Sequence, residues 1–176
     1  MDASEFTDLI RRHAGLIHKI AYAYCRGATD REDVVQEITV QLWRARDRYD
    51  ARYRHTTWIY RIALNVAISF YRRERRHRER GLPIEEDTLV VVDAVESALP
   101  GPPGEDVQLL LRCIDGLGVL EKALVLLYLD GNDHASIAEV LGISVSNVGT
   151  KLGRIKQKLR AAFEDARTPG ESHGAR

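Results

Sequence analysis

The chain has 176 residues, of which 44% are hydrophobic and 30% are charged, and its 26 basic residues balance its 26 acidic residues. This composition is typical of a folded globular protein and excludes a disordered or collagen-like chain. No apolar run approaches the roughly 18 residues that a membrane-spanning helix requires, and the first residues lack the pattern of a secretory signal. We therefore expect a cytoplasmic protein without membrane insertion.

The first predicted elements are helices, because apolar residues recur at helical spacing from Leu9 to Tyr24. A second helix is predicted to begin near Asp30, a plausible N-cap residue, and to bury Ile38 and Leu42. Its other side is polar and acidic, which is unsuited to DNA and better suited to a protein partner. The candidate residues for that partner are Asp30, Asp33, Gln36 and Glu37.

A third predicted helix runs from about Trp58 into the basic sequence 72–76. Between residues 52 and 80 there are nine arginines and two glutamates, and this local density favours phosphates even though the net charge is zero. Aromatic rings alternate here with cations, as in proteins that stack unpaired bases and hold the backbone. The candidate nucleic-acid residues are Trp58, Tyr60, Arg61, Asn65, Arg72, Arg73, Arg75 and Arg76.

The character of the chain changes after residue 80. Residues 81–106 contain seven acidic residues and no Lys or Arg, together with a cluster of Pro and Gly. Such a segment joins domains more readily than it forms part of one. The predicted organisation is all-α: a first helical domain at 1–80, a flexible acidic linker at 81–105, a second helical domain at 106–165 and a disordered tail at 166–176.

The second domain contains a predicted helix-turn-helix. Asp133 can cap a short helix, Gly142 can supply the positive φ that ends it, and Ser144 can cap the next helix. Apolar residues at spacings of three and four would hold that second helix against the first, which leaves its other face free to enter a major groove. The candidate DNA-reading residues are Ser146, Asn147, Thr150, Lys151 and Arg154.

Enzymatic and metal-binding motifs do not emerge from the sequence. The two cysteines, Cys25 and Cys113, are far apart in apolar segments and predict free thiols rather than a disulfide or a zinc site. The six histidines have no metal-ligand spacing, and no nucleophile-base set or paired carboxylates stand out. We therefore expect no cofactor, no metal and no catalytic residue.

Three motifs resemble those of bacterial RNA polymerase sigma factors. Residues 30–38 resemble the helix that binds the core enzyme, residues 57–67 with Arg72 and Arg73 resemble the region that reads and melts the minus-ten element, and residues 142–154 resemble the helix that reads the minus-thirty-five element. Their order, with the intervening linker and the length, resembles the extracytoplasmic-function (ECF) class, which has only the second and fourth sigma domains. Ser69 and Gly149 depart from the common pattern, so the resemblance does not predict a promoter sequence.

The resemblance implies partners and roles. Asp33, Gln36 and Glu37 would grip the clamp coiled coil of core RNA polymerase, and the second domain would contact its flap. Asn65 and residues 58–61 would hold the non-template strand with a base flipped out, and the four arginines at 72, 73, 75 and 76 would contact the duplex upstream. The family also implies promoter DNA as a partner, an anti-sigma factor, and association with the bacterial nucleoid when the protein is active.

Two other classes of protein remain possible from the sequence. A dimeric helix-turn-helix regulator would act without core polymerase, but it would leave the acidic face of residues 30–37 and the aromatic and basic block without a role. An anti-sigma or scaffold protein would bind polymerase without DNA, and the reading helix argues against it.

Overall fold

The computed structural model describes residues 1–79 and 105–167. Within these ranges the chain forms eight α-helices and one 3-10 helix with no strand, which confirms the all-α prediction. The predicted linker lies outside the described residues, apart from Glu105 at the start of α6. The elements are α1 (Ala3–Arg12), α2 (Ala14–Tyr24), α3 (Ala28–Ala45), η1 (Arg46–Arg48), α4 (His55–Glu79), α6 (Glu105–Asp115), α7 (Val119–Leu129), α8 (His134–Leu141) and α9 (Val145–Arg167).

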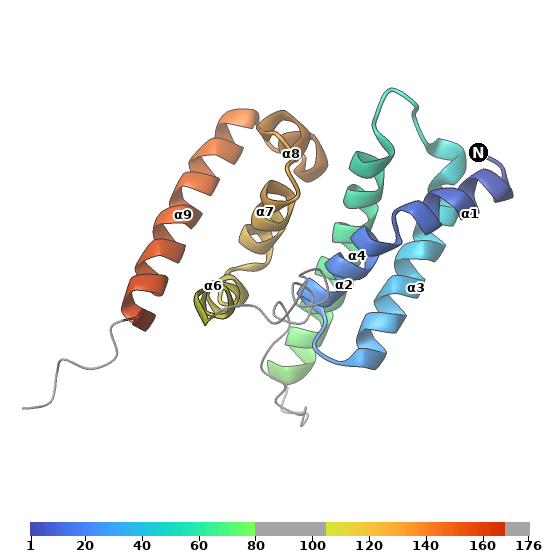
Figure 1. Ribbon diagram of the computed structural model, residues 1–176. Helices are drawn as coiled ribbons and strands as arrows, with labels where there is room; N and C mark the ends of the chain where they lie inside the picture. Colours follow the sequence, from blue (N-terminus) through green and yellow to red (C-terminus); the bar gives the residue numbers. More distant parts are fainter. Residues whose placement is uncertain (80–104, 168–176) are drawn as a thin grey trace, which may run out of the picture.

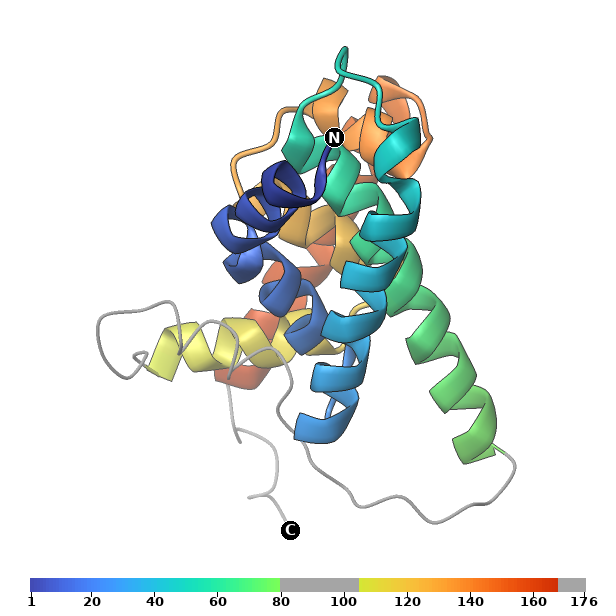
Figure 2. The same cartoon turned by 90° about the vertical axis from the view of Figure 1, so that its right-hand side faces the viewer.

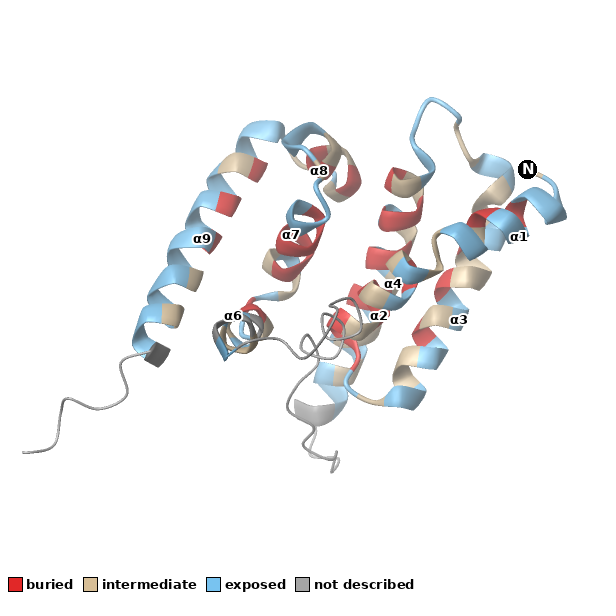
Figure 3. Ribbon diagram, viewed as in Figure 1, coloured by how far each residue is buried: buried red, intermediate tan, exposed pale blue. Residues whose placement is uncertain are grey.

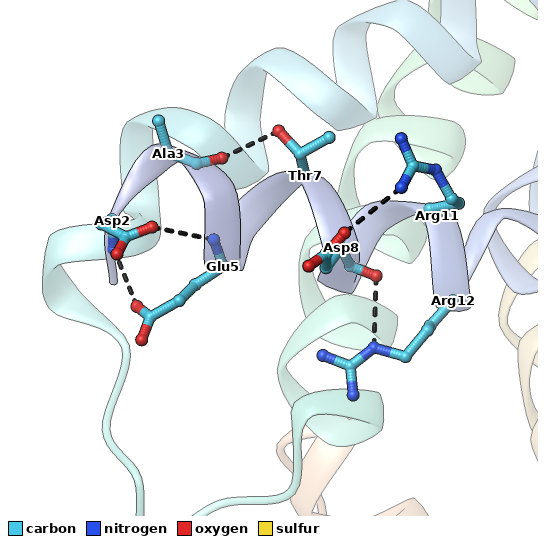
Figure 4. Close-up of polar contacts among 7 residues, drawn as sticks. All are labelled: Asp2, Ala3, Glu5, Thr7, Asp8, Arg11 and Arg12. Atoms are coloured by element: carbon cyan, nitrogen blue, oxygen red, sulfur yellow. Dashed lines mark hydrogen bonds and ion pairs between the residues drawn. The ribbon is translucent and has the colours of Figure 1, made fainter.

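Helix α1 begins with a reciprocal cap (Figure 4). The Asp2 carboxylate accepts a hydrogen bond from the Glu5 backbone N–H at 2.8 Å, and the Glu5 carboxylate accepts one from the Asp2 N–H at 2.9 Å. These bonds satisfy backbone donors that the first turn of a helix leaves without partners. At the other end Arg12 donates to the Asp8 carbonyl, and the helix stops at His13.

Helices α2, α3 and α4 pack on one another and form the core of the first half. Helix α3 begins at Ala28, near Asp30 as predicted, but the predicted N-cap is wrong, because Gly27 rather than Asp30 is the N-cap. Asp30 instead lies in the first turn, where a carboxylate is favourable because of the exposed N–H groups and the helix dipole. Ile38 and Leu42 are fully buried on the inner side of α3, as predicted.

The helices of the second half pack around α9, which contacts α6, α7 and α8. Helix α7 is almost entirely buried from residue 122 to residue 127. Helix α9 continues to Arg167, two residues beyond the predicted end of the second domain, and residues 168–176 lie outside the described range. Among the described helices, none has a stretch long and apolar enough to cross a membrane.

The two halves lie against each other (Figures 1 and 2). Helix α8 contacts α4, and the buried side chains of both halves belong to one hydrophobic cluster that includes Ile20, Ile59, Leu127 and Ile137. Buried residues accordingly line the facing sides of α2, α4, α7 and α8 (Figure 3). The sequence predicts two helical groups but not this contact between them.

Replacing each of two glycines of the second half by alanine should change the stability of the protein in opposite directions. Gly153 lies inside α9 with no atom within 4 Å of an added Cβ, so Gly153→Ala should stabilise the protein by about 1 kcal/mol through helix propensity. Gly142 has a φ of 68°, so Gly142→Ala should destabilise it by about 1 kcal/mol. Thermal unfolding followed by circular dichroism measures both, and a lower midpoint for Gly153→Ala would contradict the open environment seen here.

Candidate nucleic-acid and protein-binding interfaces

The helix-turn-helix is held by the helix-capping hydrogen bonds and the left-handed glycine that its sequence predicts. The Asp133 carboxylate accepts the Ser136 backbone N–H at 2.7 Å, and this bond lowers the pKa of Asp133. Gly142 ends α8 in the left-handed conformation, and the Ser144 hydroxyl accepts the Asn147 N–H at 3.2 Å. Together these caps fix the angle at which α9 leaves α8.

Packing orients α9. Val148, Leu152 and Ile155 are at most 3% exposed, so this side of the helix faces the core. The opposite side carries the five predicted DNA-reading residues, and all of them are exposed: Ser146, Asn147, Thr150, Lys151 and Arg154. Because Asn147, Lys151 and Arg154 are spaced by four and three residues, they lie in one row along the helix. An amide and two cations in such a row can donate to base edges and phosphates.

Two further cations of α9 are engaged within the protein. The Lys156 ammonium donates to the Tyr128 hydroxyl at 3.0 Å and lies 4.4 Å from the centre of its ring. Lys158 pairs with Glu121 at 2.9 Å, and this hydrogen bond lowers the pKa of Glu121. These two lysines therefore tie α9 to α7. Among the described residues, Lys151 and Arg154 form no hydrogen bond or ion pair with α7, although the charge of Lys151 also contributes to the lowered pKa of Glu121.

Helix α4 exposes a single polar row. Arg61, Asn65, Ser69 and Arg72 follow one another at spacings of four and three and are all exposed. Arg73, Arg75 and Arg76 extend the positive charge around the end of the helix. Ser69, Arg72, Arg75 and Arg76 line a hollow of about 620 Å³ there. The Arg73 guanidinium also lies 5.2 Å from the centre of the Phe70 ring.

An aromatic cluster lies where α4 begins, and its Tyr49 and the nearby Tyr53 are not among the predicted site residues. The Tyr49 ring stacks on His55 with centres 4.7 Å apart and lies 5.2 Å from the ring of Trp58. The Arg61 guanidinium lies 5.9 Å from the centre of Tyr53. Five arginines between residues 44 and 54, with Trp43, Tyr49 and Tyr53 among them, were the signal that could have extended the predicted block upstream.

The acidic face of α3 and the polar row of α4 share one groove of about 880 Å³. Asp33, Gln36 and Glu37 line one wall, and Asn65 and Arg73 line the other, with Val66 and Phe70 among the apolar lining. The Glu37 carboxylate is positioned by a hydrogen bond from the Gln41 amide at 2.6 Å. The structure therefore brings together residues that the sequence assigned to two separate surfaces, one for protein and one for DNA.

Three predicted site residues are less accessible than expected. Tyr60 is 3% exposed, so it cannot contact DNA in this arrangement. Asp30 is half-buried at the start of α3, beside Gly27. Trp58 is also half-buried, packed against the core as well as against Tyr49. The accessible part of the predicted minus-ten set is therefore Arg61, Asn65 and the arginines near the end of α4.

Groups of side chains that could hold a metal ion are absent from residues 1–79 and 105–167. Both cysteines are free thiols; Cys25 is buried, which raises its pKa to about 12, whereas Cys113 is only half-buried. A thiol with so high a pKa stays protonated and unreactive at neutral pH.

Two sigma-factor family models match the chain, one in each half. Residues 9–77 match the sigma-70 region 2 family model, and residues 107–159 match that of sigma-70 region 4. The RNA polymerase sigma factor CnrH of Cupriavidus metallidurans is 31% identical over 90% of this chain and 86% of its own length. The ECF sigma factor SigW of Bacillus subtilis is 24% identical over 93% of this chain and 91% of its own.

Solved structures show the same fold over both halves. The structure of CnrH in complex with the cytosolic domain of CnrY has a TM-score of 0.66 and 26% identity, and covers 95% of this chain and 92% of CnrH. The structure of RpoE from Bartonella quintana, in complex with the anti-sigma factor NepR, has a TM-score of 0.69 and 18% identity, and covers 92% of this chain and 98% of that one.

Lys156 donates a hydrogen bond to Tyr128 and Lys151 forms no such bond, and this difference predicts how each lysine affects DNA binding. Lys151→Ala should weaken binding to duplex DNA and reduce the slope of log affinity against log salt by about 1, because one phosphate contact is lost. Lys156→Ala removes the same charge from the same helix, but its ammonium is held by Tyr128, so the slope should stay near that of the wild type. Equal slopes for both variants, measured by fluorescence anisotropy, would contradict the assignment of this row.

Proposed function

The chain belongs to the extracytoplasmic-function family of RNA polymerase sigma factors, and we propose that its first half recognises the minus-ten element of a promoter and its second half the minus-thirty-five element. In this proposal α3 binds core RNA polymerase. Members of this family bind RNA polymerase and start transcription at specific promoters. They regulate transcription and catalyse no reaction of their own. The proposed role thus needs neither a cofactor nor an active site, in keeping with the sequence.

The groove between α3 and α4 is the observation that carries the proposal. Its α3 wall offers two carboxylates and an amide to a protein, and its α4 wall offers Asn65 and Arg73 to nucleic acid. A single groove can therefore join a clamp helix of the polymerase to the DNA strand that the polymerase opens. We assign Asp33, Gln36 and Glu37 to the clamp coiled coil, and Asn65 with Arg61 to the non-template strand.

Melting by this chain requires no nucleotide hydrolysis. Thermal opening of the duplex exposes a base, and capture of that base in a protein pocket offsets the unstacking free energy of a few kcal/mol. The rings of Tyr49 and Tyr53 lie near the start of the α4 row, and Arg61 within that row supplies a cation; rings and cations are the groups that hold unpaired bases. The arginines at the end of α4 would hold the duplex just upstream.

The second half carries the upstream contact in this proposal. The row of Asn147, Lys151 and Arg154 enters the major groove of the minus-thirty-five element, while α7 and its exposed Leu120 and Leu129 are available to the polymerase flap. An anti-sigma factor is a further proposed partner, because RpoE was solved with the anti-sigma factor NepR and CnrH was solved with the cytosolic domain of CnrY. We place the active protein in the cytoplasm, at the nucleoid.

Run-off transcription tests the proposed function directly. Core RNA polymerase should initiate at promoters of the source organism only when this chain is added. Glu37→Lys should reduce binding to core polymerase by on the order of tenfold or more, because it reverses a charge in the groove. Glu32→Lys is the matched control, since Glu32 is exposed on the same helix and does not line the groove.

A different result would indicate a different class of protein. If no transcript forms, and the free chain instead protects a palindromic DNA site, the chain acts as a dimeric helix-turn-helix regulator. If Glu32→Lys and Glu37→Lys weaken polymerase binding equally, the groove is not the polymerase site.

Substitution of Asn65 should separate promoter melting from the binding of core polymerase. Asn65→Ala should leave binding to core polymerase unchanged and reduce permanganate reactivity of unpaired thymines at the promoter, because the amide that holds the displaced strand is lost. Gln157→Ala, an exposed amide on α9 outside both proposed surfaces, should leave that reactivity unchanged. Full reactivity with Asn65→Ala would remove Asn65 from the melting site.

A further inference from the structure

The two flanks of α9 differ in the side chains that they offer to a ligand. With about 100° of rotation per residue, Ser146, Gly149 and Gly153 fall on one flank of the helix, and the row that contains Lys151 falls on the other. The Ser146 hydroxyl lies 3.2 Å from that of Ser144, and the two glycines have no side chain. Over residues 145–153, all of them described, this flank therefore has no long polar side chain of its own.

A side chain from the preceding helix lies beside this flank. His134 is the first residue of α8, and the Cε1 and Nδ1 atoms of its ring are each 3.8 Å from the position that a Cβ of residue 149 would take. The Nε2 atom is more than 4 Å from that position, so the ring contacts Gly149 with its Nδ1–Cε1 edge and turns Nε2 away. A side chain longer than Cβ at residue 149 would compete with the ring for this space.

The imidazole of His134 is available to a ligand. His134 is exposed, and within residues 1–79 and 105–167 its ring has no hydrogen-bond partner. The charged groups at this end of α8 are Asp133 and, from the turn before α4, Arg54: the hydrogen bond from Ser136 lowers the pKa of Asp133, and the charge of Arg54 adds to this shift. Helix α9 has no charged residue before Lys151. The two neighbouring charges are opposite in sign and leave the ring free to take up a proton.

The width of the major groove determines what each flank of α9 would meet. The groove is about 12 Å wide and a helix with its side chains is about 10–12 Å across, so both flanks of a docked helix face a phosphate backbone. In the proposed function Lys151 faces one of these backbones. The flank of Gly149 and Gly153 faces the other, and the ring of His134 lies along it. A protonated imidazole has two N–H donors and a positive charge, which together suit a phosphate oxygen.

We propose that His134 binds the DNA phosphate backbone on the Gly149 side of α9, so that the helix-turn-helix holds one backbone with Lys151 and the other with a histidine of the preceding helix. The absence of a side chain at residue 149 leaves room for the ring. Protonation of His134 strengthens the contact, and the chain therefore binds duplex DNA more tightly at pH 6 than at pH 8 through this residue. This inference rests on the proposed function, because it requires α9 to enter the major groove.

Fluorescence anisotropy with the full chain and a fluorescein-labelled random-sequence duplex tests this contact, because a phosphate contact does not depend on sequence. At pH 6, His134→Gln should reduce the slope of log affinity against log salt by up to about 0.9, the value for one cation on B-DNA. At pH 8 the variant and the wild type should have the same slope, because a neutral imidazole releases no counterion. His18→Gln is the matched control: it makes the same exchange at an exposed position of α2 and should leave the slope unchanged at both pH values.

A second pair of variants tests whether His134 and residue 149 serve the same phosphate. Gly149→Lys adds a cation to this flank, and at pH 6 its gain in affinity should be larger, on the order of threefold, in the His134→Ala background than in the wild type, because the ring no longer holds the phosphate there. Equal gains in the two backgrounds would overturn the proposal. So would a fall in slope for His134→Gln that is the same at pH 6 and pH 8, which indicates that the ring only supports α8. Circular dichroism establishes that each variant keeps its helices.

Lys151→Ala in the same assay separates this inference from the proposed function. If Lys151→Ala reduces the slope and His134→Gln does not reduce it at either pH, His134 makes no phosphate contact and the assignment of α9 to DNA stands. If neither variant reduces the slope, duplex DNA does not dock on α9, and the inference fails together with that assignment. Run-off transcription uses neither variant and decides the sigma role by itself.

Discussion

Helix α4 is packed by neighbours on most of its circumference, and the arrangement of the molecule depends on this constraint. It contacts α2 and α3 of its own half and α8 of the other, so Ile59, Ala63 and Ala67 have no exposed surface. Its basic end beyond residue 71 is largely exposed, but from residue 57 to residue 71 the helix has only a narrow side left for solvent. That side carries Arg61, Asn65 and Ser69, and Arg72 continues the row. The burial that stabilises the fold therefore also concentrates the polar groups of the first half into one row.

Packing against neighbouring helices also limits the exposed surface of α9, and here it engages basic side chains as well as apolar ones. Its inner side is apolar, and α6, α7 and α8 cover it, but its flanks reach α7 through Lys156 and Lys158. A count of basic residues in the sequence therefore overstates the charge available to DNA, because two of these lysines hold the helix in place. What remains for a ligand is the row of Asn147, Lys151 and Arg154, whose direction is set by the caps at Asp133 and Gly142.

Local features of the structure were predictable from the sequence, and contacts between distant segments were not. The caps at Asp133, Gly142 and Ser144 depend on neighbouring residues only, and the all-α fold follows from apolar spacing. The N-cap of α3 was misplaced by three residues, because Asp30 is as favourable in a first turn as at an N-cap. The apolar stripes of α7 and α8 indicate burial but do not name the partner, so neither the packing on α4 nor the burial of Tyr60 was predictable.

The groove between α3 and α4 shows why a site divided in sequence can be a single site in space. Asp33 and Glu37 repel phosphates, whereas Arg73 on the opposite wall attracts them. In the proposed role, a nucleic-acid strand would therefore be kept toward α4 and its basic end, and the α3 wall would be left to a partner without a phosphate backbone. This division of charge across one groove orients the two proposed ligands relative to each other. It also requires α3 and α4 to stay packed, which the buried Ile38 and Ile59 ensure.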